Sequence, residues 1–273
     1  MHLFRFQVSW LPWPGGEAHN NRQFNPAISM QTVLIIDDEA ATLTMFRLFL
    51  NAYGYSVLTA ENGERGLRMV DDHRPAIVFT DLKMPGMDGF EVLKRIKKTA
   101  PETEVIVITG HGDMDHAVRA LNLDATDFIN KPISRKALDA ALKRAEGRLK
   151  TDLQTAPPIQ METVSGVAVI TIRGTLTGGQ KQLLMDTLKP AADTGTRGVV
   201  ISFADYSAVN GAGMALLTRL ITEKNTAGTR FLIAGLSENF RAIFDMVGIT
   251  RVAPCVDTVE TAIAEMTDDN AAG

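Results

Sequence analysis

The sequence predicts two consecutive α/β domains, a doubly wound five-stranded parallel sheet followed by a smaller domain with a mixed sheet. The first observation is that, between residues 31 and 149, short apolar runs alternate with segments of helical apolar spacing. Such alternation implies right-handed crossovers and a parallel sheet with helices on both faces. The second observation is the Pro157-Pro158 pair, which ends any preceding helix and is followed by a hairpin signal at Ser165-Gly166.

The first domain is expected to alternate strand and helix, which suits the flavodoxin-like arrangement, in which the first and third strands are neighbours. Its expected strands are 31–36, 55–60, 76–79, 104–109 and 126–129, and its expected helices are 40–52, 64–72, 90–98, 113–121 and 134–149. Leucines of the last helix recur at the spacing of a coiled-coil seam, but packing on the sheet is the preferred interpretation.

The second domain is expected to have strands 159–164, 167–172, 198–203 and 229–234 and helices 179–188, 210–224, 239–247 and 258–266. The chain then divides into an N-terminal extension (1–30), the first domain (31–150), a linker (151–158), the second domain (159–267) and a polar tail (268–273). The extension is either a mostly disordered tail or the product of a translation start placed upstream of Met30.

The composition is that of an ordinary globular protein, with 45% hydrophobic and 22% charged residues among 273. A net charge of −4 gives no reason to expect electrostatic binding to nucleic acid. Cys255 is the single cysteine, so no intrachain disulfide can form, which suits a reducing compartment. Since no apolar run has membrane-spanning length, we expect a cytoplasmic protein that binds neither membrane nor nucleic acid.

Acidic residues gather at the ends of two predicted neighbouring strands. Asp37 and Asp38 end the first strand and Asp81 follows the third, so three carboxylates are expected in one crevice. Unpaired, they would raise one another's pKa, and a hard divalent cation such as Mg²⁺ relieves that repulsion. Lys131 follows the fifth strand and Thr109 ends the fourth, at the same rim.

This set of residues predicts transfer of a phosphoryl group to a carboxylate. Asp81 is the expected nucleophile, while the metal and Lys131 offset charge on the phosphoryl oxygens and Thr109 hydrogen-bonds the product. Each residue alone would be interpreted as a solvated strand end, and Asp37-Asp38 as a helix cap; their joint occurrence in order favours the chemistry. No further enzymatic activity is expected beyond this self-catalysed acceptance and loss of phosphate.

At these positions the chain resembles the receiver domain of two-component response regulators, over about Gln31 to Leu149. The resemblance rests on Asp37-Asp38, Asp81, Met84-Pro85, Asp88-Gly89, Thr109 and Lys131-Pro132. It implies a histidine kinase as phosphodonor and the backbone carbonyl of Lys83 as a further Mg²⁺ ligand. It also implies that Phe128 is a switch aromatic, although the sequence alone would place Phe128 in the core. The implied output face is 113–149, through which a homodimer is a further expectation.

The second domain has the wrong charge for a DNA-binding output, with 9 Lys and Arg against 12 Asp and Glu from Pro158 onward. From about Ile159 to Met266 it resembles STAS domains, the fold of anti-anti-sigma factors. The resemblance rests on Gly174-Thr175-Leu176, on the strand 199–203, on the loop and helix start 209–214, and on Phe240 to Val252. It implies a partner surface formed by Thr175, Asn210, Gly211, Ala212, Gly213 and Met214.

The loop departs from that family in a way that matters for control. Where anti-anti-sigma factors carry a phosphorylated serine this chain has Gly211, followed by Ala212, so no phosphoester can form there. We therefore expect phosphorylation of Asp81 to govern binding of an anti-sigma factor or a serine-kinase-like partner. Asn210-Gly211 also fits a simple helix cap, and Ser207 is a less favoured phosphorylation site. A scaffold in a larger signalling complex and a small-ligand module remain alternative interpretations.

Overall fold

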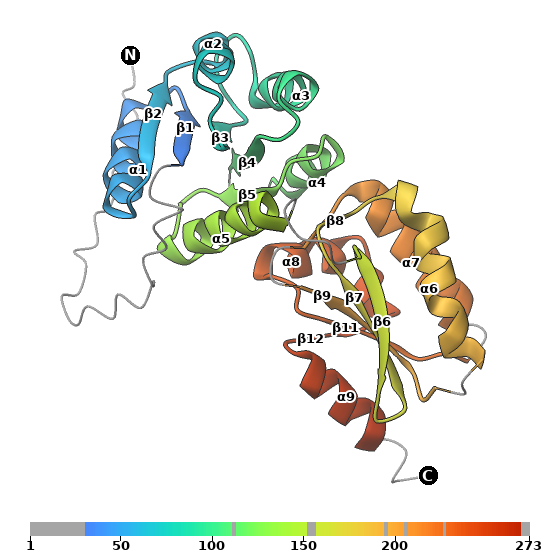
Figure 1. Ribbon diagram of the computed structural model, residues 1–273. Coiled ribbons are helices and arrows are strands. Elements are labelled where there is room, and N and C mark those ends of the chain that lie inside the picture. The colour runs from blue at the N-terminus through green and yellow to red at the C-terminus, as the bar shows by residue number, and fades with distance from the viewer. Residues whose placement is uncertain are drawn as a thin grey trace, which may run out of the picture.

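The computed structural model describes residues 31–110, 113–151, 157–193, 196–204, 207–225 and 228–268. The predicted N-terminal extension, 1–30, lies outside the described residues, as do most of the predicted linker and of the predicted tail. Figure 1 shows two α/β domains in contact, and both have the fold class that the sequence predicts.

The N-terminal domain is a five-stranded parallel sheet in the order β2-β1-β3-β4-β5, so the predicted doubly wound fold is confirmed. Its strands are β1 (Thr32–Ile36), β2 (Ser56–Ala60), β3 (Ile77–Asp81), β4 (Glu104–Thr109) and β5 (Asp127–Asn130). Its helices are α1 (Ala40–Ala52), α2 (Gly63–His73), α3 (Gly89–Thr99), α4 (Met114–Asn122) and α5 (Arg135–Thr151).

Two hydrophobic layers hold this sheet. On one face α1 and α5 bury Phe46, Leu50, Leu138 and Leu142 against β1, β3 and β4; the leucines of α5 therefore pack on the sheet. On the other face, α2, α3 and α4 bury their apolar residues in a second cluster. Because both faces are covered, all five residues of β3 are buried, and Asp81 is carried to the sheet's carboxyl edge.

The C-terminal domain has a mixed sheet in the order β12-β11-β9-β7-β6, in which β6 and β7 form an antiparallel hairpin. Its strands are β6 (Ile159–Val164), β7 (Val167–Ile172), β8 (Thr175–Leu176), β9 (Val199–Phe203), β10 (Ala208–Val209), β11 (Phe231–Ala234) and β12 (Cys255–Val256). Its helices are η1 (Gly178–Gln180), α6 (Lys181–Asp193), α7 (Gly211–Asn225), α8 (Glu238–Met246), η2 (Ile249–Arg251) and α9 (Val259–Asp268).

Short elements of this domain differ from the sequence expectation. Strands β8 and β10 are two-residue strands that pair with each other, and β12 is equally short, below the length at which a periodic pattern can be recognised. Helix α6 runs to Asp193 with Pro190 inside it, although the expected helix ended at Leu188. Strand β8 and the start of α7 form one end of the domain.

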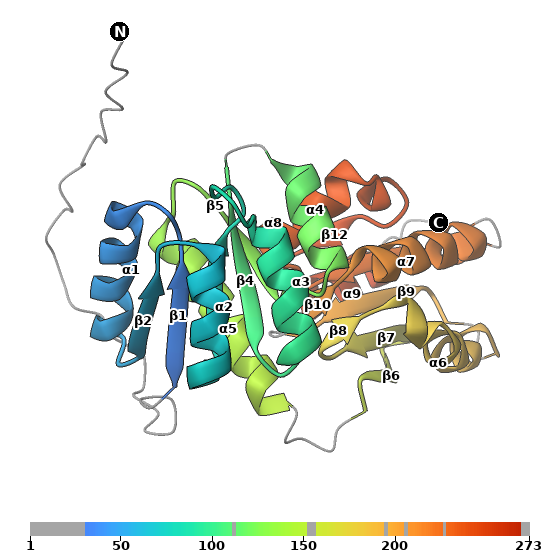
Figure 2. The same ribbon diagram turned by 90° about the horizontal axis from the view of Figure 1, so that it is seen from above.

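The two domains meet along α4, β5 and α5 on one side and α7, α8 and β8 on the other, as Figures 1 and 2 show from two directions. Apolar residues of both domains belong to one buried cluster, which includes Leu121 and Phe128 of the first and Met214 and Phe240 of the second. Within the described residues, no helix combines the length and apolar character needed to cross a membrane.

Candidate functional site

Two buried carboxylates share one ammonium group at the carboxyl edge of the first sheet. Lys131 Nζ lies 3.3 Å from Asp37 Oδ2 and 3.2 Å from Asp81 Oδ1. Neighbouring strands carry the two acids, and Lys131 follows β5, where its backbone N–H donates to the Thr109 carbonyl over 2.8 Å. Glu39 Oε2 lies farther from the same ammonium, at 3.8 Å. The sequence did not single out Glu39, although it continues the acidic run.

Burial raises the pKa of both Asp37 and Asp81. It raises the pKa of Asp37 to about 6, although the Glu39 N–H and the Lys131 ammonium oppose this. Burial likewise raises the pKa of Asp81, against the opposing charge of Lys131, while the exposed Asp38 adds to the rise. When ionised, Asp37, Asp81 and the nearby Asp38 together carry more negative charge than the single Lys131 ammonium offsets.

The residues present fit a hard divalent cation by their chemistry. Among the described residues no three acidic, histidine or cysteine side chains are arranged closely enough to hold a metal by themselves. Magnesium, however, usually takes only one or two protein carboxylates together with waters and phosphate oxygens. Asp37 and Asp81 supply such carboxylates, and the excess negative charge between them is what a cation relieves.

Thr109 and Lys83 border the carboxylates. The Thr109 hydroxyl is buried and has no hydrogen-bond partner in the part of the chain that the structure describes. A buried hydroxyl without a partner costs free energy, so its position is better explained by a group that binds there. Lys83 directs its ammonium to Asp113, 2.6 Å away, while its backbone N–H donates to Asp81 Oδ2 over 3.3 Å.

Phe128 lies beyond the crevice, fully buried in the core between the sheet and α4. Its backbone carbonyl accepts a hydrogen bond of 2.7 Å from Asn239 Nδ2, which belongs to the second domain. Strand β5 thus has the lysine of the crevice just beyond its carboxyl end and a contact with the second domain in its middle.

The six residues expected to bind a partner lie at one end of the second domain. Thr175 is in β8, and Asn210 caps α7 by accepting the Gly213 N–H over 2.9 Å. Gly213 and Met214 are buried, whereas Ala212 is exposed. This end of the domain faces the first domain: Arg148 of α5 donates to Thr175 Oγ1, and Asn210 Nδ2 lies 3.4 Å from Asp124 Oδ1.

Two residues that the sequence did not single out hold the same contact. Arg144 of α5 pairs with the fully buried Asp127 of β5, donates to the Ser207 carbonyl over 3.2 Å, and lies over the Phe240 ring. Burial raises the pKa of Asp127, opposed by Arg144 and by hydrogen bonds from Phe128 and Asn239. Asp127 is the first residue of β5, and its position beside the apolar Phe128 and Ile129 was the signal available in the sequence.

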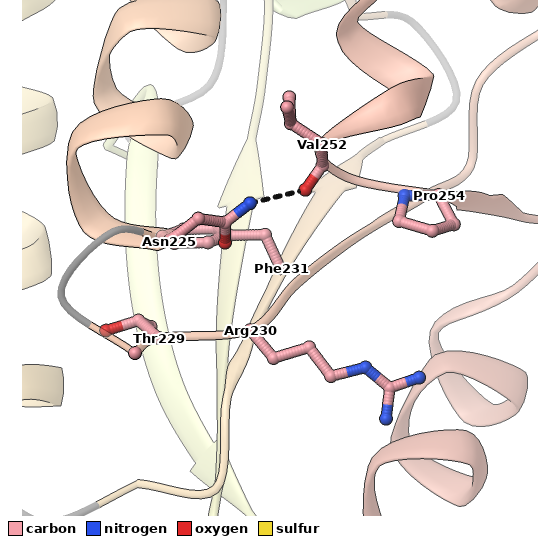
Figure 3. A pocket seen from close by; sticks show the side chains of 7 residues that line it. Asn225, Thr229, Arg230, Phe231, Val252 and Pro254 are labelled. Atoms are coloured by element: carbon pink, nitrogen blue, oxygen red, sulfur yellow. Dashed lines mark hydrogen bonds between the residues drawn. The ribbon is translucent and has the colours of Figure 1, made fainter.

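A cavity of about 340 Å³ lies at the other end of α7, lined by Asn225 and residues 228–231, 252 and 254. In Figure 3, Asn225 donates to the Val252 carbonyl, and Arg230 points away from that amide. Helix α7 has 15 residues, so this cavity is roughly 20 Å from Asn210. It gives no support to a small-ligand site at Asn210.

Comparison with known proteins agrees with both domains. The model of the response regulator receiver domain matches residues 33–143, and the model of the STAS domain matches residues 158–262. The five-stranded parallel fold and the acidic crevice of the first domain thus agree with the receiver match. The chain contains a response regulator receiver domain, and a STAS domain follows it.

The relatives match only part of the chain. Transcriptional regulatory protein GlrR of Escherichia coli strain K12 is 37% identical over 113 residues, 41% of this chain and 26% of that protein. Transcriptional regulatory protein AfsQ1 of Streptomyces coelicolor is 36% identical over 114 residues, 42% of this chain and 50% of that protein. This chain therefore spans half or less of the length of these two curated relatives.

Solved structures give a similar result. A response regulator receiver domain protein from Clostridium thermocellum is 36% identical and covers 45% of this chain and 99% of its own, with a TM-score of 0.43. Receiver domains in general bind Mg²⁺ at their phosphorylation site and interact with histidine kinases, and STAS domains in general interact with anti-sigma factors. Both are signalling modules.

Proposed function

We propose that Asp81 accepts a phosphoryl group from a histidine kinase and that this modification controls binding of the STAS domain to an anti-sigma factor or a similar serine-kinase-like protein. The observation that supports this best is that the Asp81 carboxylate lies beside the Lys131 ammonium. At the same edge of the sheet, the buried Thr109 hydroxyl has no hydrogen-bond partner among the described residues. We place the exchange in the cytoplasm, which suits a chain with one cysteine.

Asp81 is the nucleophile of the proposed transfer. A carboxylate oxygen forms a bond to phosphorus while the P–N bond of the donor phosphohistidine breaks and its electron pair returns to the imidazole. Lys131 is placed to neutralise a phosphoryl oxygen, because its ammonium already contacts Asp81. Thr109 then donates its hydroxyl proton to a phosphoryl oxygen, which gives that buried group a partner.

Asp37, Asp38, Asp81 and the Lys83 carbonyl would hold Mg²⁺ at this site. When bound, the cation would offset the charge of the phosphoryl oxygens. Asp37 is positioned for this by the Glu39 N–H, which fixes one carboxylate oxygen at 2.8 Å and leaves the other near Lys131. The exposed Asp38 acts on Asp81 by its charge and has room to bind the cation through water.

The proposed output surface is the end of the STAS domain that contains Thr175 and the start of α7. Gly211 and Ala212 have no hydroxyl, so a partner kinase cannot release itself by phosphorylating these positions. Control by Asp81 replaces that route. The N-cap role of Asn210 is compatible with this function, since a well-ordered helix start presents a defined surface.

The proposal is tested by capture of partners on the immobilised full chain, with and without beryllofluoride and Mg²⁺, beside Asp81→Ala as control. We expect an anti-sigma factor or serine-kinase-like protein whose recovery changes with beryllofluoride on the wild type and stays constant on Asp81→Ala. Equal recovery in all four samples would contradict control by Asp81. Recovery of structural STAS proteins in place of such a partner would favour the scaffold interpretation.

A further inference from the structure

The receiver domain covers the STAS surface to which the proposed partner would bind. Three receiver side chains contact the STAS domain at this surface. Arg148 donates to Thr175, Arg144 donates to the Ser207 carbonyl, and Asp124 lies beside Asn210. The side chain of Arg144 is 6% exposed, so this contact is closed to water. Ala212 stays exposed, but a second protein that binds Thr175 and Asn210 would have to displace these contacts.

The end of α4 lies directly against Gly211. A Cβ atom built on Gly211 would lie 2.7 Å from Asn122 Cγ and 2.8 Å from Asn122 Nδ2, where Asn122 is the last residue of α4. Real side chains do not make such short contacts, so the arrangement requires glycine or a displaced Asn122. Gly211 is the first residue of α7 and does not have a positive φ, so its backbone conformation does not require glycine.

The same interface reaches the phosphorylation site through β5. Asn239 binds the carbonyl of Phe128, in the strand that leads to Lys131. Asp127 joins the Phe128 N–H to Arg144, which spans to Ser207 and Phe240. A shift of β5 toward a phosphorylated Asp81 would therefore change the positions of both Asn239 and Arg144 relative to their partners. Packed interfaces of this kind respond by switching between discrete arrangements.

We propose that the unmodified receiver occupies the STAS docking surface of its own chain, that Gly211 is the seat for the end of α4, and that phosphorylation of Asp81 vacates this surface. The inference rests on the proposed function and gives its direction: partner binding is low before phosphorylation and rises after it. The absence of a side chain at Gly211 then also leaves room for the Asn122 side chain in the closed chain, besides removing a modification site.

Hydrogen exchange of the full chain tests the closed contact without any partner. The peptides to follow are those that cover the end of α4 and the start of α7. Gly211→Leu adds a side chain at the seat, and we expect exchange in both peptides to rise about tenfold or more. Gly179→Leu is the matched control, because a Cβ there meets nothing nearer than Thr177 Oγ1 at 3.7 Å; it should leave both peptides unchanged.

A milder pair of substitutions shows whether the obstruction is Asn122 itself. Gly211→Ala should raise exchange less than Gly211→Leu, and Asn122→Ala in the same chain should return it to within about twofold of the wild type. Alanine has a higher helix propensity than glycine, so Gly211→Ala should not unfold α7. If Gly211→Leu fails to fold, Asn239→Ala is the second variant, with the same expected rise. Unchanged exchange in the folded variants would overturn the proposal.

Beryllofluoride with Mg²⁺ tests the release step on the same peptides. We expect the exchange of both peptides in the wild type to rise as in Gly211→Leu, and that of Asp81→Ala to stay constant. If intact mass shows phosphoryl uptake at Asp81 from acetyl phosphate while exchange stays constant with either reagent, the release is wrong and the proposed function stands. If no phosphoryl group is taken up, the proposed function fails, and Gly211→Leu still decides whether the receiver covers the surface.

Discussion

At the scale of single residues, the balance of charge around Lys131 determines what the crevice can do. One ammonium contacts two buried carboxylates, and both acids keep a raised pKa despite it. In the metal-free state burial disfavours the ionised form of both carboxyl groups. Added positive charge would favour that form and lower both pKa values. This explains why the same residues suit both a cation and a transferred phosphoryl group.

Lys131→Met should show what the ammonium contributes to stability and what it contributes to phosphoryl uptake. Removal of the ammonium leaves Asp37 and Asp81 without their shared partner, so we expect loss of about 1–3 kcal/mol of stability in metal-free buffer. Phosphoryl uptake from acetyl phosphate should slow by roughly 100-fold, because one group that stabilises the transition state is gone. Urea unfolding and intact mass measure the two effects. The exposed Lys98→Met is the control; a similar loss there would contradict a specific role of Lys131.

The pH dependence of stability should show the raised pKa of Asp37. A carboxyl group whose folded pKa is about 6, above its usual value of 3.8, holds its proton more tightly in the folded chain. Its contribution is therefore full below pH 3.8 and is lost as the pH rises through 6. Metal-free wild type should lose on the order of 1 kcal/mol relative to Asp37→Asn across this range, after discount for solvent screening. A pH-independent difference in thermal unfolding between the two proteins would argue against the raised pKa.

At the scale of elements, the start of α3 lies against the backbone of Asp81, the proposed nucleophile. Gly89 is the first residue of α3, and a Cβ there would lie 2.8 Å from Leu82 Cα and overlap the Asp81 carbonyl. Asp88 precedes it as the N-cap and accepts the Glu91 N–H over 2.8 Å. Both residues of the Asp88-Gly89 pair thus have a structural role. Asp88 caps the helix, and Gly89 allows the helix to approach the strand that contains Asp81.

Gly89→Ala should therefore damage the site through the backbone. We expect a destabilisation of about 1–3 kcal/mol from overpacking, together with slower phosphoryl uptake by Asp81. Chemical unfolding and acetyl-phosphate labelling measure the two effects. Gly179→Ala, which adds the same methyl group where there is space, should alter neither. A Gly89→Ala protein of normal stability would mean that the backbone of α3 gives way easily.

Much of the fold could be predicted at this scale because long elements have clear periodicity. Strands such as β4 are continuous apolar runs, and α1 begins and ends at the predicted residues. The crevice was predictable because carboxyl ends of neighbouring parallel strands must meet. The pair β8–β10 was not, since two residues have no period. The Arg144–Asp127 pair was also missed, because each charge looks solvent-exposed until the partner that buries it is known.

At the scale of the whole molecule, Arg144 links the two domains: it pairs with the buried Asp127 of the receiver and donates to the Ser207 carbonyl of the STAS domain. Arg144→Met would leave a buried carboxylate without its cation, and we expect a loss of about 3 kcal/mol or more in urea unfolding. Because the Asp127 carboxylate causes that loss, Asp127→Asn in the same chain should recover most of it. The exposed pair Lys136–Glu238 is the control, with less than about 1 kcal/mol for Lys136→Met. Equal losses from the two pairs would contradict a buried Arg144–Asp127 pair.

The arrangement also bears on the expected homodimer. The receiver face 113–149 that was expected to pair two copies is here in contact with the STAS domain. Two receivers could pair through it only after the STAS domain has moved away. Partner binding and dimer formation would then both be consequences of one opening event.

The central claim is that Asp81 is the residue that receives the phosphoryl group. The most direct test is peptide mapping by mass spectrometry of the full chain after incubation with Mg²⁺ and acetyl phosphate. We expect the mass of one phosphoryl group on the peptide that contains Asp81 and none in Asp81→Ala. A wild-type chain that gains no phosphoryl group, or gains it on another residue, would exclude Asp81 as the acceptor.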